Sequence, residues 1–296
     1  MSRGFDRQLT VFSPQGRLYQ IGALRCDVCC AAVRGLLILP RARAAHAVRG
    51  GEGRLARNER PLTVPPPLSA PSCVASEYAF KAVLSSGLTS VAARGDRTVC
   101  MVTQKKVPDK LIDPTSMTNM HKITPKIGVC VTGQPADAVR QVERMRAEAA
   151  QFMYDNGYAI PVHHLAKRMA DVNQVFSQRA GTRTMAVISI ICGIDEERGA
   201  QLFKVDPAGQ VWGFHACAAG VKQMAAQNHF EKVYKDSPTL DRAATVQAAL
   251  LTLQTVLQVD LRADDVEVSI VHEDELFRNL DEAEIEAHLQ ALADRD

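Results

Sequence analysis

The chain has 296 residues and a formal net charge of +2 at pH 7. This length suffices for a substantial core in one large domain or two small ones, and the near-neutral charge gives no indication of nucleic-acid or anionic-membrane binding. No apolar run approaches the roughly 20 residues of a membrane span, and the N-terminus has no signal-peptide core. Eight cysteines at irregular spacing indicate reduced thiols, so we expect a protein of the cytoplasm and nucleus.

Residues 1–20 carry an aromatic-Asp-Arg triplet, Phe5-Asp6-Arg7, followed by a predicted turn, Ser13-Pro14-Gln15-Gly16. Proline at the second position of the turn and glycine at the fourth are typical of a β-turn. After a long interruption, residues 77–82 begin an amphipathic helix that places Tyr78 one turn from Ala82. None of these residues is catalytic by type, so the pattern predicts a structured tail followed by a docking helix.

Residues 21–75 form that interruption. Arginine and alanine dominate the middle of the segment, and a proline-rich run covers residues 61–71. Neither helical nor strand periodicity is sustained, which predicts a disordered insertion. Pro, Leu and Ser codons are largely pyrimidine, and a pyrimidine-rich tract precedes the end of an intron, so we interpret the segment as an intron translated in frame or an error in the gene prediction. The alternative is a genuine lineage-specific loop.

Four of the cysteines lie in this insertion, at positions 26, 29, 30 and 73. Four thiolates could hold a tetrahedral zinc ion, but no second cysteine pair has the required spacing. We therefore expect incidental thiols, with neither a metal nor a cofactor. Adjacent helical residues diverge by about 100°, so we interpret His163 and His164 as surface histidines. We expect Cys130 and Cys192, in apolar strands, to be buried and unreactive.

From residue 84 the sequence alternates strand and helix patterns. Helix 135–155 has proline in its first turn and ends at Asn156-Gly157, and Asp281 with Glu284 fits a capping box for the last helix. The continuous apolar run 185–192 predicts a strand that is covered on both sides. We expect strands at 89–93, 98–103, 127–131, 185–192, 201–205, 210–214 and 266–270, and helices at 135–155, after 161, at 221–234 and 238–258, and after 281.

This order of strands and helix pairs predicts a layered α+β domain with sheets inside and helices outside. The apolar stripes of the helices should face the sheets. The expected buried side chains are Val139, Val142, Met145, Ala149 and Phe152 in the first helix, Leu165, Met169, Val172 and Phe176 in the second, and Ile285, Leu289 and Leu292 in the last.

Joined across the interruption, these segments resemble the signature of the alpha-type subunits of the core proteasome. That signature contains an aromatic-Asp-Arg triplet, a Phe-Ser-Pro-x-Gly-Arg-Leu run, here residues 12–18, and a Glu-Tyr-Ala block, here residues 77–79. The resemblance covers the chain except about 21–75. Among the seven alpha types it is most similar to the iota type (alpha type-6). The further matching blocks are residues 103–111, 206–209, 218–223 and 282–289.

The resemblance implies the four-layer αββα sandwich of the N-terminal-nucleophile hydrolases. It divides the chain into a gate tail at 1–20, the insertion at 21–75 and an alpha-type domain at 76–296. Catalytic members use a Thr, Ser or Cys at a freed N-terminus, whose α-amine acts as the base. Thr89 and Ser90, at the start of the first core strand, are the candidates here, but the retained tail indicates that the chain is catalytically inert. An active amidohydrolase, cleaved before Thr89 or Ser90, and a non-proteasomal binding paralogue are the alternatives.

The resemblance also implies gating. Phe5, Asp6 and Arg7 match the gate triplet, Pro14 the turn that supports it, and Tyr78 the aromatic that braces the open gate. Phe5 departs from the Tyr of many members and lacks its phenol hydrogen bond. Taken without the resemblance, Asp6 and Arg7 would be a solvated surface pair and Tyr78 a core residue.

The last implication is assembly. The resemblance predicts a seven-membered alpha ring stacked on a beta ring that carries the Thr nucleophiles, acting in ubiquitin-dependent protein degradation. Lys122 matches the lysine that pairs with the C-terminal carboxylate of an activator between neighbouring alpha subunits. Gly133 matches the small residue at the floor of that pocket. The plainer interpretation of Lys122 is an exposed surface lysine.

Overall fold

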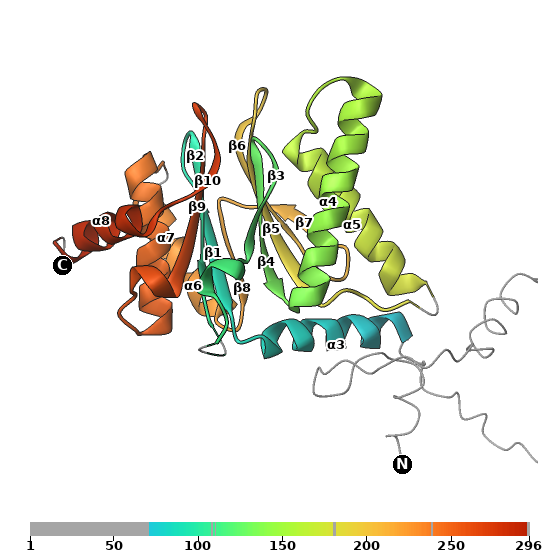
Figure 1. Cartoon of the computed structure of the whole chain (residues 1–296), viewed down its shortest axis with the longest axis horizontal. Helices are drawn as coiled ribbons and strands as arrows, with labels where there is room; N and C mark the ends of the chain where they lie inside the picture. The colour runs from blue at the N-terminus through green and yellow to red at the C-terminus, as the bar shows by residue number, and fades with distance from the viewer. Residues whose placement is uncertain (1–70, 108, 110, 180–181, 238, 295–296) are drawn as a thin grey trace, which may run out of the picture.

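The computed structural model describes residues 71–294 except 108, 110, 180–181 and 238, and for residues 71–75 it describes the backbone alone. Its centre is a pair of stacked antiparallel sheets (Figure 1). The first sheet has the order β10-β9-β2-β1-β8, with β1 (Thr89–Arg94), β2 (Thr98–Gln104), β8 (Ala216–Gly220), β9 (Val266–His272) and β10 (Glu275–Asn279). The second has the order β3-β4-β5-β6-β7, with β3 (Met120–Thr124), β4 (Ile127–Gly133), β5 (Val187–Asp195), β6 (Gly199–Val205) and β7 (Val211–Gly213).

Helices cover the outer face of each sheet. In Figure 1 one helical layer lies to the right of the second sheet and the other lies to the left of the first. A further helix, α3 (Pro71–Ser85), crosses the lower end of the sandwich and contacts α5, β4 and β5. The right layer contains α4 (Pro135–Asn156) and α5 (Val162–Gln178), and the left layer contains α6 (Gln223–Asp236), α7 (Arg242–Leu257) and α8 (Glu282–Ala293). The predicted four-layer αββα sandwich is confirmed.

Three layers of buried side chains join the four layers of backbone, and β5 shows how the sequence builds two of them. Successive strand residues point to opposite faces of a sheet. Ile188 and Ile190 therefore enter the core between the sheets, whereas Val187 and Ile191 pack under α4 and α5. Every residue from Val187 to Gly193 is buried. The predicted strand that is covered on both sides is confirmed.

The space between the sheets also contains a buried cluster of hydroxyl groups. The Ser90 hydroxyl of β1 lies 2.6 Å from the Thr103 hydroxyl of β2 and 2.8 Å from the Thr132 hydroxyl of β4. Thr103 and Thr132 are completely buried. A buried hydroxyl without a partner costs about 1–3 kcal/mol, so this cluster favours the one stacking of the two sheets that pairs all three groups.

One edge of the sandwich is closed by an aromatic ring on a glycine. The Phe277 ring of β10 lies so close to Gly128 of β4 that a Cβ at this position would be 1.9 Å from the Phe277 Cε2 atom. The Phe277 amide donates to the Pro125 carbonyl at 2.8 Å. Glycine is required here by close approach, because the ring of the first sheet rests directly on the backbone of the second.

A half-buried tyrosine attaches the left helical layer to its sheet. The Tyr234 hydroxyl of α6 donates to the Arg94 carbonyl at 2.6 Å or the His215 carbonyl at 3.0 Å, and accepts from the Arg94 amide at 3.1 Å. Desolvation of the phenol raises the pKa of Tyr234 to about 12. The neutral phenol therefore holds the end of β1 over the whole physiological pH range.

The sequence pattern missed three strands, β3, β8 and β10. Strand β8 is the small-residue run Ala216–Gly220, which lacks the β-branched residues typical of strands. Strands β3 and β10 lie at sheet edges and are partly exposed, so their apolar periodicity is weak. Helix α3 begins at Pro71, within the predicted insertion 21–75. Among the described residues, no helix is both long and apolar enough to cross a membrane.

The predicted apolar stripe of α4 was wrong at its first position, Val139. Val139 is 54% exposed, and the buried positions there are Asp137 and Gln141 instead. Asp137 accepts hydrogen bonds from Arg183 and from the Ala186 amide at 3.0 Å. This carboxylate turns the polar side of the first turn inward, so Val139 faces outward. Ile285 and Leu292 of α8 are buried as predicted, and the capping box of Asp281 and Glu284 is confirmed.

We predict that Gly128→Ala destabilises the fold by about 1 to 3 kcal/mol, because the new methyl group must displace the Phe277 ring from a packed core. Equilibrium unfolding in denaturant measures the loss. Phe277→Leu serves as the second arm of a double-mutant cycle, since the smaller side chain should tolerate the added methyl group at position 128 and make the two effects non-additive. Equal stability of Gly128→Ala and the parent chain would contradict the close approach.

Candidate functional site

Of the five predicted gate residues, Tyr78 lies within the described part of the chain. Phe5, Asp6, Arg7 and Pro14 lie outside it, so their role stays a prediction. Tyr78 is buried on α3 at 8% exposure, in the core between the sheets. The Lys81 ammonium lies 5.1 Å from the centre of its ring, a distance that allows a cation–π contact. Tyr78 therefore fixes α3 on the end of the sandwich, which is the plainer of the two predicted roles.

Lys122, the predicted activator-binding lysine, lies on the edge strand β3 and is exposed. Its backbone carbonyl accepts two hydrogen bonds from the Arg146 guanidinium of α4, at 3.1 and 3.0 Å. Arg146 thus occupies an acceptor at the open edge of the sheet and limits strand addition there. The Lys122 side chain forms no ion pair within the described residues and can take an anionic partner.

Gly133, the predicted floor of the same pocket, lies at the far end of β4 from Lys122. Lys122 pairs with Gly128, and Gly133 pairs with Val187 of β5. Five strand residues separate Gly128 from Gly133, a distance of about 17 Å at 3.4 Å per residue. The structure therefore does not bring Lys122 and Gly133 together within one subunit. Gly133 has φ +144, and a Cβ there would lie 2.2 Å from the Ala186 carbonyl, so close packing requires this glycine.

The candidate nucleophiles Thr89 and Ser90 lie at the start of β1, and both are 1% exposed. The Ser90 hydroxyl is used in the buried hydroxyl cluster. The peptide bond before Thr89 is held from both sides: the Leu88 carbonyl accepts from the Val221 amide at 3.2 Å, and the Thr89 amide donates to the Gln104 side chain at 3.2 Å. Gly220 packs against this bond, since a Cβ there would be 1.9 Å from the Leu88 oxygen.

The remaining candidates from the sequence are two cysteines and two histidines. Cys130 and Cys192 are buried as predicted, and burial raises the pKa of each thiol to about 12. His164 is exposed, 5.1 Å from the Phe152 ring, whereas His163 is half-buried, so the surface interpretation is correct for His164 and incomplete for His163. The described residues contain no group of three or more His, Cys, Asp or Glu side chains that could hold a metal ion.

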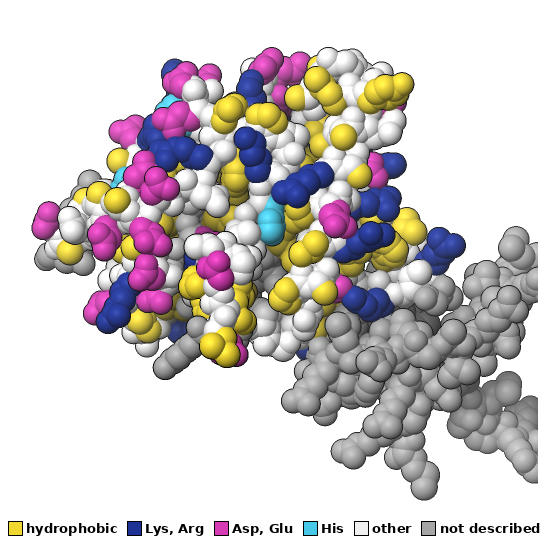
Figure 2. Space-filling model, in the orientation of Figure 1, with side chains coloured by type: hydrophobic (Ala, Val, Ile, Leu, Met, Phe, Trp, Pro, Cys, Tyr) yellow, Lys and Arg dark blue, Asp and Glu magenta, His cyan; other side chains and the backbone are white. Residues whose placement is uncertain are grey.

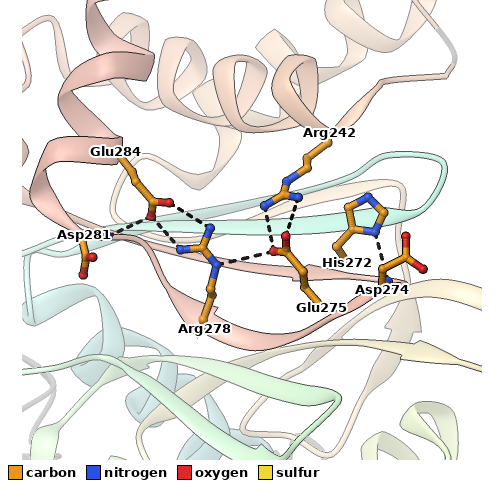
Figure 3. A network of polar contacts seen from close by, with 7 residues as sticks. All are labelled: Arg242, His272, Asp274, Glu275, Arg278, Asp281 and Glu284. Atoms are coloured by element: carbon orange, nitrogen blue, oxygen red, sulfur yellow. Dashed lines mark hydrogen bonds and ion pairs between the residues drawn. The ribbon is translucent and has the colours of Figure 1, made fainter.

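A network of ion pairs joins α7, β10 and α8 (Figure 3). Arg242 donates to both carboxylate oxygens of Glu275 at 2.8 Å, and Arg278 bridges from Glu275 at 3.5 Å to Glu284 at 2.7 and 3.0 Å. Glu284 also accepts from the Asp281 amide at 3.2 Å, which completes the capping box. Arg242 and Arg278 hold the pKa values of Glu275 and Glu284, respectively, below their usual range.

The sequence pattern predicted only the capping box of this network. Arg242 lies on α7, far before Glu284 in the chain. Arg278 lies on β10, a strand that the sequence pattern did not predict. Both ion pairs are bidentate, and this geometry holds α8 in a fixed position. The arrangement can orient a helix, and arginines hold both glutamates of its ion pairs.

Comparison with known proteins gives the family. The model of the family described as "Proteasome subunit" matches residues 84–271. The chain is 38% identical to the probable proteasome subunit alpha type-1 of Schizosaccharomyces pombe, over all of this chain and 99% of the relative. It is 33% identical to the proteasome subunit alpha type-6 of Caenorhabditis elegans, over all of this chain and 98% of the relative. It is 35% identical to the proteasome subunit alpha type-2 of Oryza sativa subsp. indica, over 73% of this chain and 90% of the relative.

These relatives carry different type numbers, so they do not distinguish the predicted iota type from other alpha types. Their agreement on the class is independent of that choice, and the family model covers every strand of the two sheets except β10 and the last residue of β9. The chain therefore belongs to the proteasome subunit family, among its alpha-type subunits.

Proposed function

We propose that the chain is a non-catalytic subunit of the alpha ring of the core proteasome, occupying the iota position. It contributes to ring assembly, pore gating and activator docking in ubiquitin-dependent protein degradation, in the cytoplasm and nucleus. Its partners are the other alpha subunits, the beta ring that carries the catalytic threonines, and the C-terminal tails of activators. The observation that carries the proposal is the match along the whole chain to relatives that are named alpha-type subunits.

The burial of Thr89 supports the non-catalytic assignment. An N-terminal nucleophile needs a free α-amine and access to substrate. Here the Leu88–Thr89 bond lies between hydrogen bonds to Val221 and Gln104 and under the backbone of Gly220. Cleavage would require this packed junction to open, which supports the non-catalytic assignment over an active amidohydrolase.

The experiment that tests the proposal is purification of the endogenous chain with its complex. We expect beta subunits to copurify and the intact mass of the chain to include residues 1–20. A mass that begins at Thr89 or Ser90 would establish the amidohydrolase alternative. An intact chain that purifies without beta subunits would establish a non-proteasomal binding paralogue.

For the activator contact, we predict that Lys122→Ala weakens activator binding by about 1.5 to 3 kcal/mol, the range for a hydrogen bond to a charged group. Ring assembly should be unchanged because the side chain is exposed. Lys126→Ala is the matched control: it removes another exposed lysine of the same hairpin, which pairs with Glu196 at 2.9 Å. Unchanged stimulation of the Lys122→Ala complex by every tail-bearing activator would refute the role of Lys122.

For the gate, we predict that deleting residues 21–70 is neutral or stabilising for folding and assembly. The deletion stops before Pro71 because α3 begins there. The full chain should give a leakier gate, measured as faster unstimulated hydrolysis of small peptides, because the insertion separates Pro14 from Tyr78 and removes their fixed offset. Tightly closed rings with the full chain, together with failed assembly of the deletion, would show that the segment is a genuine structural element.

A further inference from the structure

The last part of the described chain carries a strong excess of acidic side chains. Between residues 259 and 294, twelve side chains are Asp or Glu and two are Arg, although the whole chain has a net charge of +2. Figure 2 shows acidic side chains gathered on the left of the view, where Figure 1 places α7 and α8. Charge is therefore segregated on the surface, and the helical layer with α8 attracts cations.

At least half of these acidic side chains are exposed and unpaired. Glu273, Glu275 and Glu284 belong to ion pairs with arginines. Of the others, eight are exposed and form no ion pair with any described residue, and six of these lie within residues 260–265, on α8 or directly after it. These six residues are Asp260, Asp264, Asp265, Glu282, Glu286 and Asp294. Like charges at such density repel one another, so a cationic partner gains more here than on a surface of balanced charge.

A groove lies within this acidic surface, between residues 261–264 and α8. It is a cavity of about 320 Å³, near the lower end of the range for ligand sites, so its size suits one or two side chains. The half-buried Leu261 and Leu289 supply apolar surface, and Asp264 and Glu286 lie on opposite walls. Arg262 also lines the groove, so acidic side chains outnumber basic ones by one in its lining.

The helix extends the acidic wall beyond the groove. Residues four apart lie on one face of a helix, so Glu282, Glu286 and Gln290 form a stripe along α8. The ion-pair network fixes the start of the same helix, because Glu284 is held by Arg278 and caps the helix at Asp281. The stripe is therefore presented by a helix that is fixed at its N-terminus rather than by a loop.

We propose that this groove docks a short basic segment of another protein. One apolar side chain of the segment enters between Leu261 and Leu289, and its lysines or arginines contact Asp264, Glu282 and Glu286. The sign of the surface is opposite to that required for a nucleic acid or an anionic membrane. A second copy of the chain does not fit, because a twofold contact places the same acidic patch against itself.

The test uses a labelled lysine-rich peptide with one central leucine, titrated against the full-length chain and against the complex that contains it. Asp264→Asn combined with Glu286→Gln should raise the dissociation constant at least tenfold. The matched control is Asp171→Asn combined with Glu197→Gln, which removes two exposed acids elsewhere on the surface that form no ion pair with a described residue, and it should change the constant less than about twofold. Both double variants keep side-chain size, so thermal unfolding should confirm equal folding.

A second peptide, with serine in place of leucine, separates docking from general charge attraction. We expect it to bind at least tenfold more weakly than the leucine peptide. Equal binding of the two peptides, or equal binding by the two double variants, would overturn the proposal. So would binding to the free chain but not to the complex, since a neighbouring subunit would then cover the groove. Concentration-dependent dimers that Asp264→Asn with Glu286→Gln abolishes would assign the surface to a second copy instead.

Discussion

The structure depends on the contact between its two sheets, and β1 takes part in that contact beside the central strand β2. β1 pairs with β2 and β8 and packs under α7. Toward the other sheet it presents Ala92 and the Ser90 hydroxyl, which meets Thr103 and Thr132. Small side chains allow the two sheets to approach closely. The hydroxyl cluster favours the one stacking of the sheets in which all three hydroxyl groups have a hydrogen-bond partner. The start of β1, which carries the candidate nucleophiles Thr89 and Ser90, is thereby filled with structural contacts.

Local pattern predicted most of the fold because its central elements are locally unambiguous. The run from Val187 to Gly193 is buried on both faces, and α4 has both a proline at its start and Gly157 in the left-handed conformation at its end. The predictions that failed concern positions whose structure is determined by tertiary contacts. Val139 is exposed because Asp137 is drawn inward by Arg183 and the Ala186 amide. Strand β8 forms from a run of small residues because it pairs along its whole length with β1.

The candidate site was less predictable than the fold, because matching motifs assigns residues to a pocket without giving their separation. Lys122 and Gly133 are close in the sequence, but the β3–β4 hairpin register puts them at opposite ends of β4. A pocket that uses both would have to extend along the strand or receive them from neighbouring subunits. Gly133 also has a sufficient structural reason in the approach of the Ala186 carbonyl, so its identity alone carries no functional information.

The attachment of α8 explains why the acidic surface can be both exposed and ordered. Seven of the twelve residues of α8 are apolar, and Ile285 and Leu292 are its buried side chains. Apolar burial holds the helix on its neighbours, whereas its three glutamates repel one another. Arg278 removes one of them from that repulsion by pairing with Glu284, and the same carboxylate caps the helix. The other two glutamates of the helix, Glu282 and Glu286, are then held in fixed positions on the surface. A bound cationic group would relieve the repulsion between them.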